Sequence, residues 1–127
     1  MSTPSDPRLS GLQLAVMRAV WSRGEATVGD VHAALQDDRS LAPTTVATLL
    51  KRLEARGLLA HRKEGRQFIY RALVDADDMG RSLVTELARD MYDGKSADMF
   101  AHLLDAGEVS AEDLARIRKM IEEHEGA

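Results

Sequence analysis

APTTVATLLKRLEARGLLAHRKEGRQFIYR, residues 42–71, is the stretch that decides the fold of this 127-residue chain. In its first half, apolar side chains recur at the spacing of a helix with one buried face. This helix is predicted to begin near Pro43 and to end at Gly57, a residue type that suits the carboxyl terminus of a helix. The buried stripe consists of Val46, Leu49, Leu50 and Leu53.

The second half of the stretch has the period of a β-strand. Phe68 and Tyr70 are predicted on one face of a returning strand, and residues 63–66, with Gly65 among them, form the turn. A lone two-stranded hairpin is marginal in water, so we expect it to pack on helices. A helix followed by such a hairpin predicts the recognition helix and wing of a winged helix-turn-helix domain.

Two further helices are predicted before this stretch. Ser10 and Gln13 form a capping box that opens the first helix, which ends at Gly24. Thr27 and Asp30 form a second capping box. The apolar stripes are Leu12, Val16, Ala19 and Val20 in the first helix and Val28, Val31 and Leu35 in the second.

Three amphipathic helices are predicted after residue 73. The first has an acidic first turn at residues 75–78 and ends near residues 92–94, the second spans 96 to about 105, and Ser110 with Asp113 caps the third. These short helices have few aromatic residues and cannot bury their apolar faces well alone, so we expect them to pair with a second copy. The residues predicted at this dimer contact are Leu83, Leu87, Phe100, Leu103, Leu114, Ile117 and Ile121.

The predicted fold class is mainly α with a small β-hairpin, a winged helix-turn-helix domain followed by a C-terminal helical dimerisation region. The chain length allows one ordinary domain with a core of its own, or a small domain plus an oligomerisation element. Three segments are predicted: a disordered arm at residues 1–9, which holds two prolines, a winged-helix DNA-binding domain at 10–73, and the dimerisation region at 74–127.

Charge is divided unevenly along the chain. Between Arg39 and Arg71 there are eight Lys and Arg against two acidic residues, a local charge of +6 in a chain whose net charge is −4. Up to Leu73 the net charge is +4, and after it −8. A positive N-terminal part suits a polyanion such as DNA, which would repel the acidic C-terminal part.

Composition argues against several other classes of protein. The chain has no cysteine, no apolar run that could span a membrane and no apolar segment at its N-terminus, so we expect a cytoplasmic protein without membrane insertion. The four histidines are scattered and predict no metal site, His61 being expected on the wing near phosphate. No nucleophile elbow, glycine-rich phosphate loop or zinc-protease motif is present, so no cofactor and no enzymatic activity are predicted.

The sequence resembles the BlaI/MecI/CopY family of bacterial penicillinase-type repressors over nearly its whole length. The resemblance rests on four blocks in their spacing: LSGLQLAVMRAVW, ATVGDVHAAL, TTVATLLKRLEARGLL and GRQFIYRALV. It implies a dimeric repressor with an N-terminal winged helix, a C-terminal helical dimerisation region and a palindromic DNA operator in front of resistance genes.

The resemblance also implies where DNA is contacted. Thr45, Thr48 and Arg52 match positions at which the recognition helix of the family meets DNA, and helical spacing independently turns this face outward. Threonine hydroxyl and methyl groups can bind phosphate or read a thymine methyl group, whereas Lys and Arg hold phosphates. The complete predicted DNA-binding set is Thr44, Thr45, Ala47, Thr48, Lys51 and Arg52 on the helix, with Arg62, Lys63 and Arg66 on the wing.

The sequence departs from the family in two places. Some members carry a C-terminal Cys-x-Cys metal motif, and a chain without cysteine cannot sense copper through thiolates. Other members are inactivated by cleavage of an Asn-Phe bond, and the matching position here reads His102-Leu103. This pair is the candidate proteolytic switch, and a sensor-transducer protease of different specificity is the candidate partner.

Two alternative functions remain open from the sequence. Winged helices also serve as protein-interaction modules, although such a module has no need for a charge of +6 on helix and hairpin. A regulator that still binds DNA but responds to a small effector held by the C-terminal helices is the second alternative.

Overall fold

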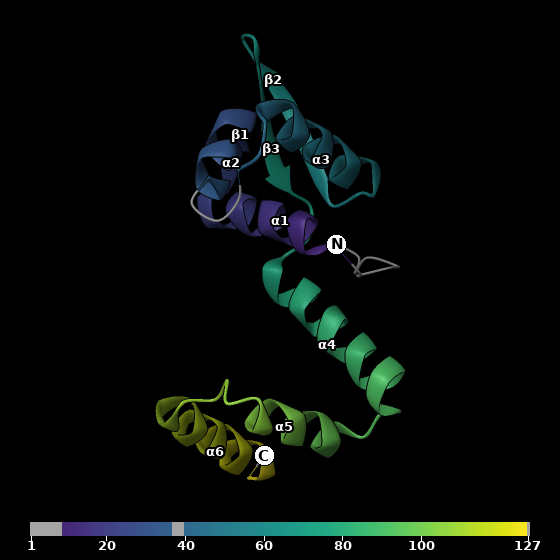
Figure 1. The fold of residues 1–127 in the computed structure, drawn as a ribbon, viewed down its shortest axis with the longest axis vertical. Helices are drawn as coiled ribbons and strands as arrows, with labels where there is room; N and C mark the ends of the chain where they lie inside the picture. Colours follow the sequence, from purple (N-terminus) through teal and green to yellow (C-terminus); the bar gives the residue numbers. More distant parts are fainter. Residues whose placement is uncertain (1–8, 37–39, 127) are drawn as a thin grey trace. The chain divides into compact units, whose positions relative to one another are not determined.

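The computed structural model describes residues 9–36 and 40–126, and Figure 1 shows the path of the chain. The chain forms two compact units that divide within one helix, between Val84 and Thr85. Residues 37–39 and most of the predicted arm, residues 1–8, lie outside the described residues. Leu9 packs against the core, so it belongs to the folded unit rather than to the arm.

Three helices build the first unit: α1 (Gly11–Arg23), α2 (Val28–Leu35) and α3 (Pro43–Ala55). The first two begin as predicted, with complete capping boxes. In the first box the Gln13 amide donates to Ser10 Oγ at 3.0 Å. These reciprocal bonds satisfy amide groups that the first turn of a helix leaves unpaired, which fixes where each helix starts.

The sheet has three strands, whereas the sequence predicted two. The strands are β1 (Glu25–Thr27), β2 (Leu59–Glu64) and β3 (Gln67–Ala72), in the antiparallel order β1-β3-β2. The three residues of β1 are too few to show a strand period, yet they pair with β3 and cover an edge that a two-stranded hairpin would leave open. The turn is also tighter than predicted, since only Gly65 and Arg66 separate β2 from β3.

The predicted apolar stripes of α1, α2 and α3 meet in one core beneath the sheet. Tyr70 of β3 and Met17 of α1 are its largest members, and burial raises the pKa of the Tyr70 hydroxyl. Leu12 and Val28 lie at the edge of this core and are half-buried. The fully buried apolar residues include Val16, Val20, Val31, Val46, Leu50, Leu53 and Leu59.

The helix α4 (Ala76–Tyr92) begins inside the first unit. Met79 is buried there, and Leu83 packs against the core. Just before the helix, the carbonyl of Val74 accepts a hydrogen bond from Trp21 Nε1 at 2.9 Å. The first turns of α4 are therefore part of the winged-helix core.

The second unit contains the rest of α4 together with α5 (Ser96–Asp105) and α6 (Ala111–Glu125), so the three predicted C-terminal helices are present. The side chain of Ser110 caps α6 by accepting from the Asp113 amide at 3.0 Å. No side chain of α5 or α6 is buried. Within the described part of the chain, none of the helices combines the length and the apolar character that crossing a membrane requires.

Candidate DNA-binding interface

The helix α3 has one buried and one exposed face. Its buried face packs on the core. Because a helix has about 3.6 residues per turn, the residues on the opposite face point to solvent. Ala47 is half-buried, and the other predicted DNA-contacting residues of the helix are exposed. The exposed set is Thr44, Thr45, Thr48, Lys51 and Arg52.

The hydroxyl group of Thr48 is engaged within the helix. Its Oγ1 donates to the carbonyl oxygen of Thr44 at 3.0 Å. Because a threonine hydroxyl has one proton, Thr48 can offer an outside ligand its methyl group and the lone pairs of its oxygen, but no donor. This arrangement suits an apolar contact with a thymine methyl group.

The amino terminus of α3 is open to an anion. Ala42 is the N-cap residue and has no side-chain oxygen, and Pro43 occupies the first turn. The Thr45 amide bonds back to the Ala42 carbonyl at 3.0 Å, whereas the Thr44 amide is one of the groups that a helix leaves unpaired at its start. Backbone N–H groups in this position favour phosphate binding.

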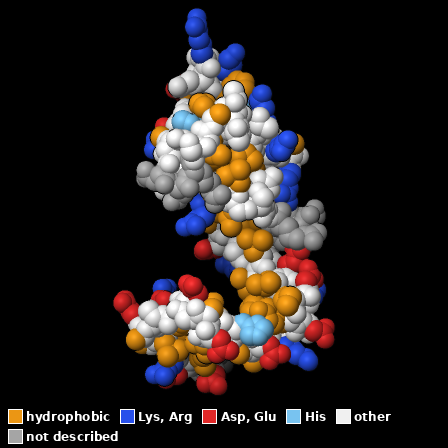
Figure 2. Space-filling view, in the orientation of Figure 1, with side chains coloured by type: hydrophobic (Ala, Val, Ile, Leu, Met, Phe, Trp, Pro, Cys, Tyr) orange, Lys and Arg blue, Asp and Glu red, His pale blue; other side chains and the backbone are white. Residues whose placement is uncertain are grey.

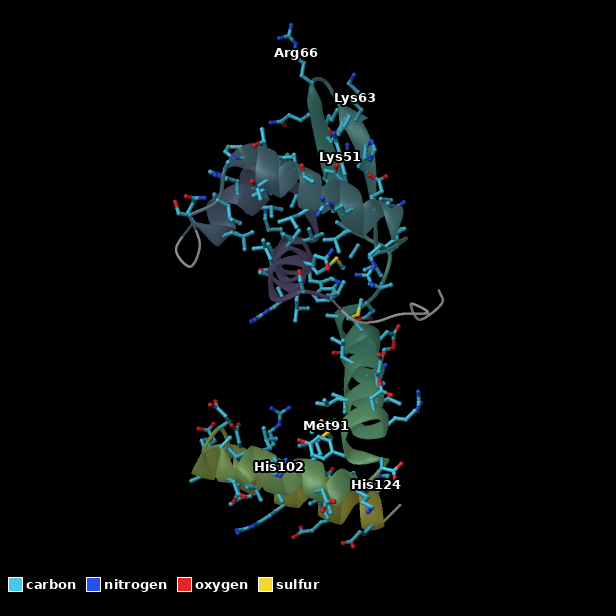
Figure 3. The ribbon with its side chains drawn as sticks, turned by 45° about the vertical axis from the view of Figure 1, so that its right-hand side comes forward. Lys51, Lys63, Arg66, Met91, His102 and His124 are labelled. Atoms are coloured by element: carbon cyan, nitrogen blue, oxygen red, sulfur yellow. The ribbon has the colours of Figure 1, made fainter. Side chains whose placement is uncertain are left out.

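The wing carries two exposed cations near its tip. Arg66 lies in the turn and Lys63 near the end of β2, and Figure 3 shows both side chains projecting from the wing, with Lys51 on the neighbouring α3. Neither these three nor Arg52 forms an ion pair with another residue of the described ranges. Figure 2 shows Lys and Arg side chains at the tip of the wing and along one side of the first unit. The charge of Lys51, Arg52, Lys63 and Arg66 is therefore available to a polyanion.

Arg62 differs from the other predicted phosphate contacts. Its guanidinium is paired with Glu25 of β1 at 3.1 Å and also with Glu64 of β2. Hydrogen bonds to these two carboxylates raise the pKa of Arg62 above its usual range, and the bond to Glu25 has the larger effect. Arg62 thus connects the two outer strands of the sheet across β3, a role that the sequence did not predict.

The wing is also joined to the recognition helix α3, by a contact between His61 and Glu54. His61 of β2 donates from Nδ1 to Glu54 of α3, at 2.7 Å from Oε1 and 2.9 Å from Oε2. The imidazole ring also stacks against Phe68, with 4.4 Å between ring centroids. His61 thus lies on the wing as predicted and also joins it to α3, a contact that the sequence did not predict.

The described residues contain no group of three side chains suited to hold a metal ion. The histidines make other contacts instead. His32 donates from Nε2 to the Leu41 carbonyl at 2.8 Å, next to the segment that leads into α3. His102 Nδ1 lies 3.1 Å from the Tyr92 hydroxyl in the second unit.

The predicted dimer residues fall into three groups. Leu83 packs against the winged-helix core, Leu114 and Ile117 are half-buried, and the others expose large apolar surfaces. The candidate switch His102-Leu103 lies inside α5 with both side chains exposed. The exposed dimer residues are Leu87, Phe100, Leu103 and Ile121, and Met91, Leu104 and Met120 add to the same kind of surface.

Comparisons with known proteins identify the family of the chain. The sequence model of the penicillinase repressor family matches residues 9–123. The penicillinase repressor of Bacillus licheniformis is 29% identical over 118 residues, 93% of this chain and 92% of that protein. The transcriptional regulator BlaI of Mycobacterium tuberculosis is 33% identical over 120 residues, 93% of this chain and 86% of that protein.

A solved structure shows the same winged-helix fold. The solution structure of the DNA-binding domain of the repressor BlaI matches with a TM-score of 0.51 and 32% identity, over 61% of this chain and 90% of that one. The matched proteins are repressors, which confirms the prediction of a DNA-binding protein that is not an enzyme. The chain therefore belongs to the penicillinase repressor family and is a DNA-binding transcriptional repressor.

Proposed function

We propose that this repressor binds a palindromic operator as a homodimer, with α3 of each subunit in the major groove of one half-site. The observation that carries the proposal is the exposed face of α3, which presents three threonines together with Lys51 and Arg52, both free of ion pairs among the described residues. Such a face combines groups that read bases with groups that neutralise phosphates.

The side chains divide between these two tasks. Thr45, Ala47 and Thr48 read base edges, and the open start of α3 at Thr44 receives a phosphate. Lys51 and Arg52, with Lys63 and Arg66 on the wing, hold the backbone and fix the register. Arg62 acts indirectly, because its pairing with Glu25 and Glu64 fixes the shape of the sheet that carries the wing.

The exposed apolar side chains of the helical unit support the homodimer. Several large apolar residues of α4, α5 and α6 remain about half exposed in one chain, and pairing with a second copy would remove that surface from water. A two-fold symmetric dimer presents two recognition helices related by the same symmetry, which a palindromic operator matches. The dimerisation region predicted at residues 74–127 is narrowed in this proposal to the part from Thr85 on, because Met79 and Leu83 pack in the winged-helix unit.

The regulated genes are proposed from the relatives. Those relatives include a penicillinase repressor and a methicillin resistance regulatory protein, so we assign this repressor to resistance genes. A sensor-transducer protease that cuts at His102-Leu103 would end repression. Because this bond lies within α5 and Leu103 is also a proposed dimer contact, cleavage requires local unwinding of that helix and opening of the contact.

The alternative of a protein-interaction module has less support. Such a module would present an apolar patch on α3, whereas the exposed face of α3 is polar and positively charged. The exposed cations Lys51, Arg52, Lys63 and Arg66, which form no ion pair among the described residues, therefore favour DNA over a protein partner.

A genome-fragment pull-down tests the proposal. The full chain is incubated with sheared genomic DNA at about physiological salt, and retained fragments are sequenced, since specific sites survive salt that strips non-specific binding. The test variant is Arg52→Ala, which removes an exposed cation from α3. The matched control is Lys119→Ala, which removes an exposed cation from α6. Enrichment of a few palindromes with wild type and Lys119→Ala, but not with Arg52→Ala, is expected. Equal, unenriched recovery with all three proteins would overturn the proposed operator binding.

A further inference from the structure

A groove in the first unit is not used by the proposed DNA contacts. It lies between α1 and the first turns of α4 and encloses about 510 Å³, a volume in the range of small-molecule sites. Its walls are mainly apolar. The residues that define it are Leu14, Arg18, Trp21, Met79, Gly80 and Leu83.

The groove has a fixed aromatic wall. Trp21 is half-buried, and its Nε1 donates to the Val74 carbonyl at 2.9 Å, so the indole ring is held in place by a bond to the segment that enters α4. The indole therefore needs no hydrogen bond from a ligand and can offer its ring surface. A fixed ring beside Met79 and Leu83 suits a flat apolar body, because aromatic groups gain from offset stacking as well as from burial.

Gly80 keeps the groove open. It lies in the interior of α4, where glycine is a poor helix former and where no positive φ requires it. No neighbouring atom lies within 4 Å of the place that a Cβ would take. A larger residue would therefore be tolerated by the helix and would fill the groove instead.

Arg18 gives the groove its charge. It is the one charged residue of the lining, it is exposed, and within the described ranges it forms no ion pair. A single guanidinium at the rim of an apolar groove complements a ligand with one carboxylate and an apolar body, since Arg and carboxylate form charge-assisted, often bidentate hydrogen bonds. We propose that this groove is a binding site for a small aromatic monocarboxylate, with its ring against Trp21 and its carboxylate on Arg18.

The site has a consequence for repression that rests on the proposed function. The helix α4 belongs to the first unit at Met79 and continues into the second unit at Thr85. A ligand that bridges α1 and α4 acts on the segment that connects the DNA-reading unit to the proposed dimerisation helices. Occupancy is therefore expected to change the affinity for the operator, because a ligand that binds this segment more tightly in one of its two arrangements shifts the equilibrium between them.

The single tryptophan of the chain makes the site directly measurable. The full chain, without DNA, is titrated with benzoate, phenylacetate and 3-phenylpropionate while Trp21 emission is recorded. At least one of them is expected to give a saturable change. Benzamide, which lacks the carboxylate, is expected to bind about tenfold more weakly, the equivalent of one charge-assisted hydrogen bond.

Two variants locate the ligand. Gly80→Leu should abolish the saturable change while helix content by circular dichroism stays the same, because its side chain occupies the groove. Arg18→Gln should reduce the affinity for the carboxylates to that for benzamide and leave benzamide unchanged. The matched control Arg81→Gln, which removes a cation of α4 outside the groove lining, should behave like wild type.

Three results would overturn the site. No saturable change with any of the three carboxylates would exclude the ligand class, and unchanged binding by Gly80→Leu would place the ligand elsewhere. Emission that depends on protein concentration but not on carboxylate would show that a second copy covers the groove. Because these measurements contain no DNA, they are independent of operator binding. A bound ligand that leaves operator affinity unchanged would overturn the coupling alone.

Discussion

His61 Nδ1 lies 2.7 Å from Glu54 Oε1, so a strand of the wing is tied directly to the recognition helix. The two residues are separated in the sequence by the end of α3 and the start of β2. Half-exposed pairs of this kind contribute only about 0.2–1 kcal/mol to stability. We therefore expect the contact to act by positioning, because the proposed DNA contacts require helix and wing in one fixed arrangement.

A double-mutant cycle tests this positioning role. His61→Ala and Glu54→Ala should each weaken operator binding several-fold, and the double variant should be no weaker than either single variant, since both remove the same contact. Thermal unfolding should shift little. Operator affinities measured by fluorescence anisotropy give the cycle, and losses that simply multiply in the double variant would show that the two residues act separately.

The two wing arginines should differ in the salt dependence of binding. Arg66→Ala removes a cation that pairs with no other described residue and is expected to reduce the slope of log K against log salt by about 0.9. Arg62→Ala removes a cation that Glu25 and Glu64 already neutralise, so the slope should hardly change even where affinity falls. DNA titrations at several salt concentrations measure the slope for each variant. Equal slope changes for Arg62→Ala and Arg66→Ala would mean that Arg62 breaks its ion pairs with Glu25 and Glu64 to contact phosphate.

The engaged hydroxyl of Thr48 predicts which part of this side chain reads DNA. Thr48→Val keeps the branched shape and should retain the preference among operator variants, whereas Thr48→Ala removes the methyl group and should lose it. A mismatched base pair typically costs about 1–3 kcal/mol, so the effect should be visible in competition binding with operators changed at one position. Loss of preference in Thr48→Val would indicate readout through the hydroxyl oxygen.

Gly80→Ala should stabilise the protein. Glycine in a helix interior costs about 0.5–1 kcal/mol relative to alanine, and a Cβ at this position meets no atom within 4 Å. A higher Tm by calorimetry is expected. Gly29→Ala serves as the comparison, because Gly29 lies in the first turn of α2, which Thr27 caps, and not in a helix interior. A lower Tm for Gly80→Ala would mean that a contact absent from the single chain occupies this place.

Leu103→Asp should dissociate the proposed dimer, because it places a charge among exposed apolar side chains that a second copy would cover. Sedimentation should show monomers that still contain the winged helix and bind the operator weakly. Lys119→Asp introduces an acidic residue at a polar position of α6 and should remain dimeric. A wild-type chain already monomeric at micromolar concentration would remove the proposed dimer.

Local signals in the sequence predicted the helices and which face of α3 is exposed. Capping boxes at Ser10 and Thr27 and the apolar stripe of α3 act within a few residues, so they can be read without knowledge of the fold. The strand β1 was missed because three residues carry no period and their partner, β3, lies far along the chain.

The partners of the interface residues were missed for the same reason. Glu25 and Glu54 look like ordinary surface acids in the sequence, and only the folded chain brings them to Arg62 and His61. The groove beside Gly80 likewise depends on how α1 and α4 pack against each other, and the local sequence pattern does not predict this packing.

Every fully buried apolar side chain of the described residues lies at or before Met79, and α5 and α6 bury none. The half that reads DNA can therefore stay folded when the last two helices are cut or unwound. In the proposed dimer, such an event removes bivalency, since two tethered DNA-binding units bind about 10²–10⁴-fold more tightly than one through effective concentration alone. Repression could then be lifted by disconnecting these units, with no need to denature either of them.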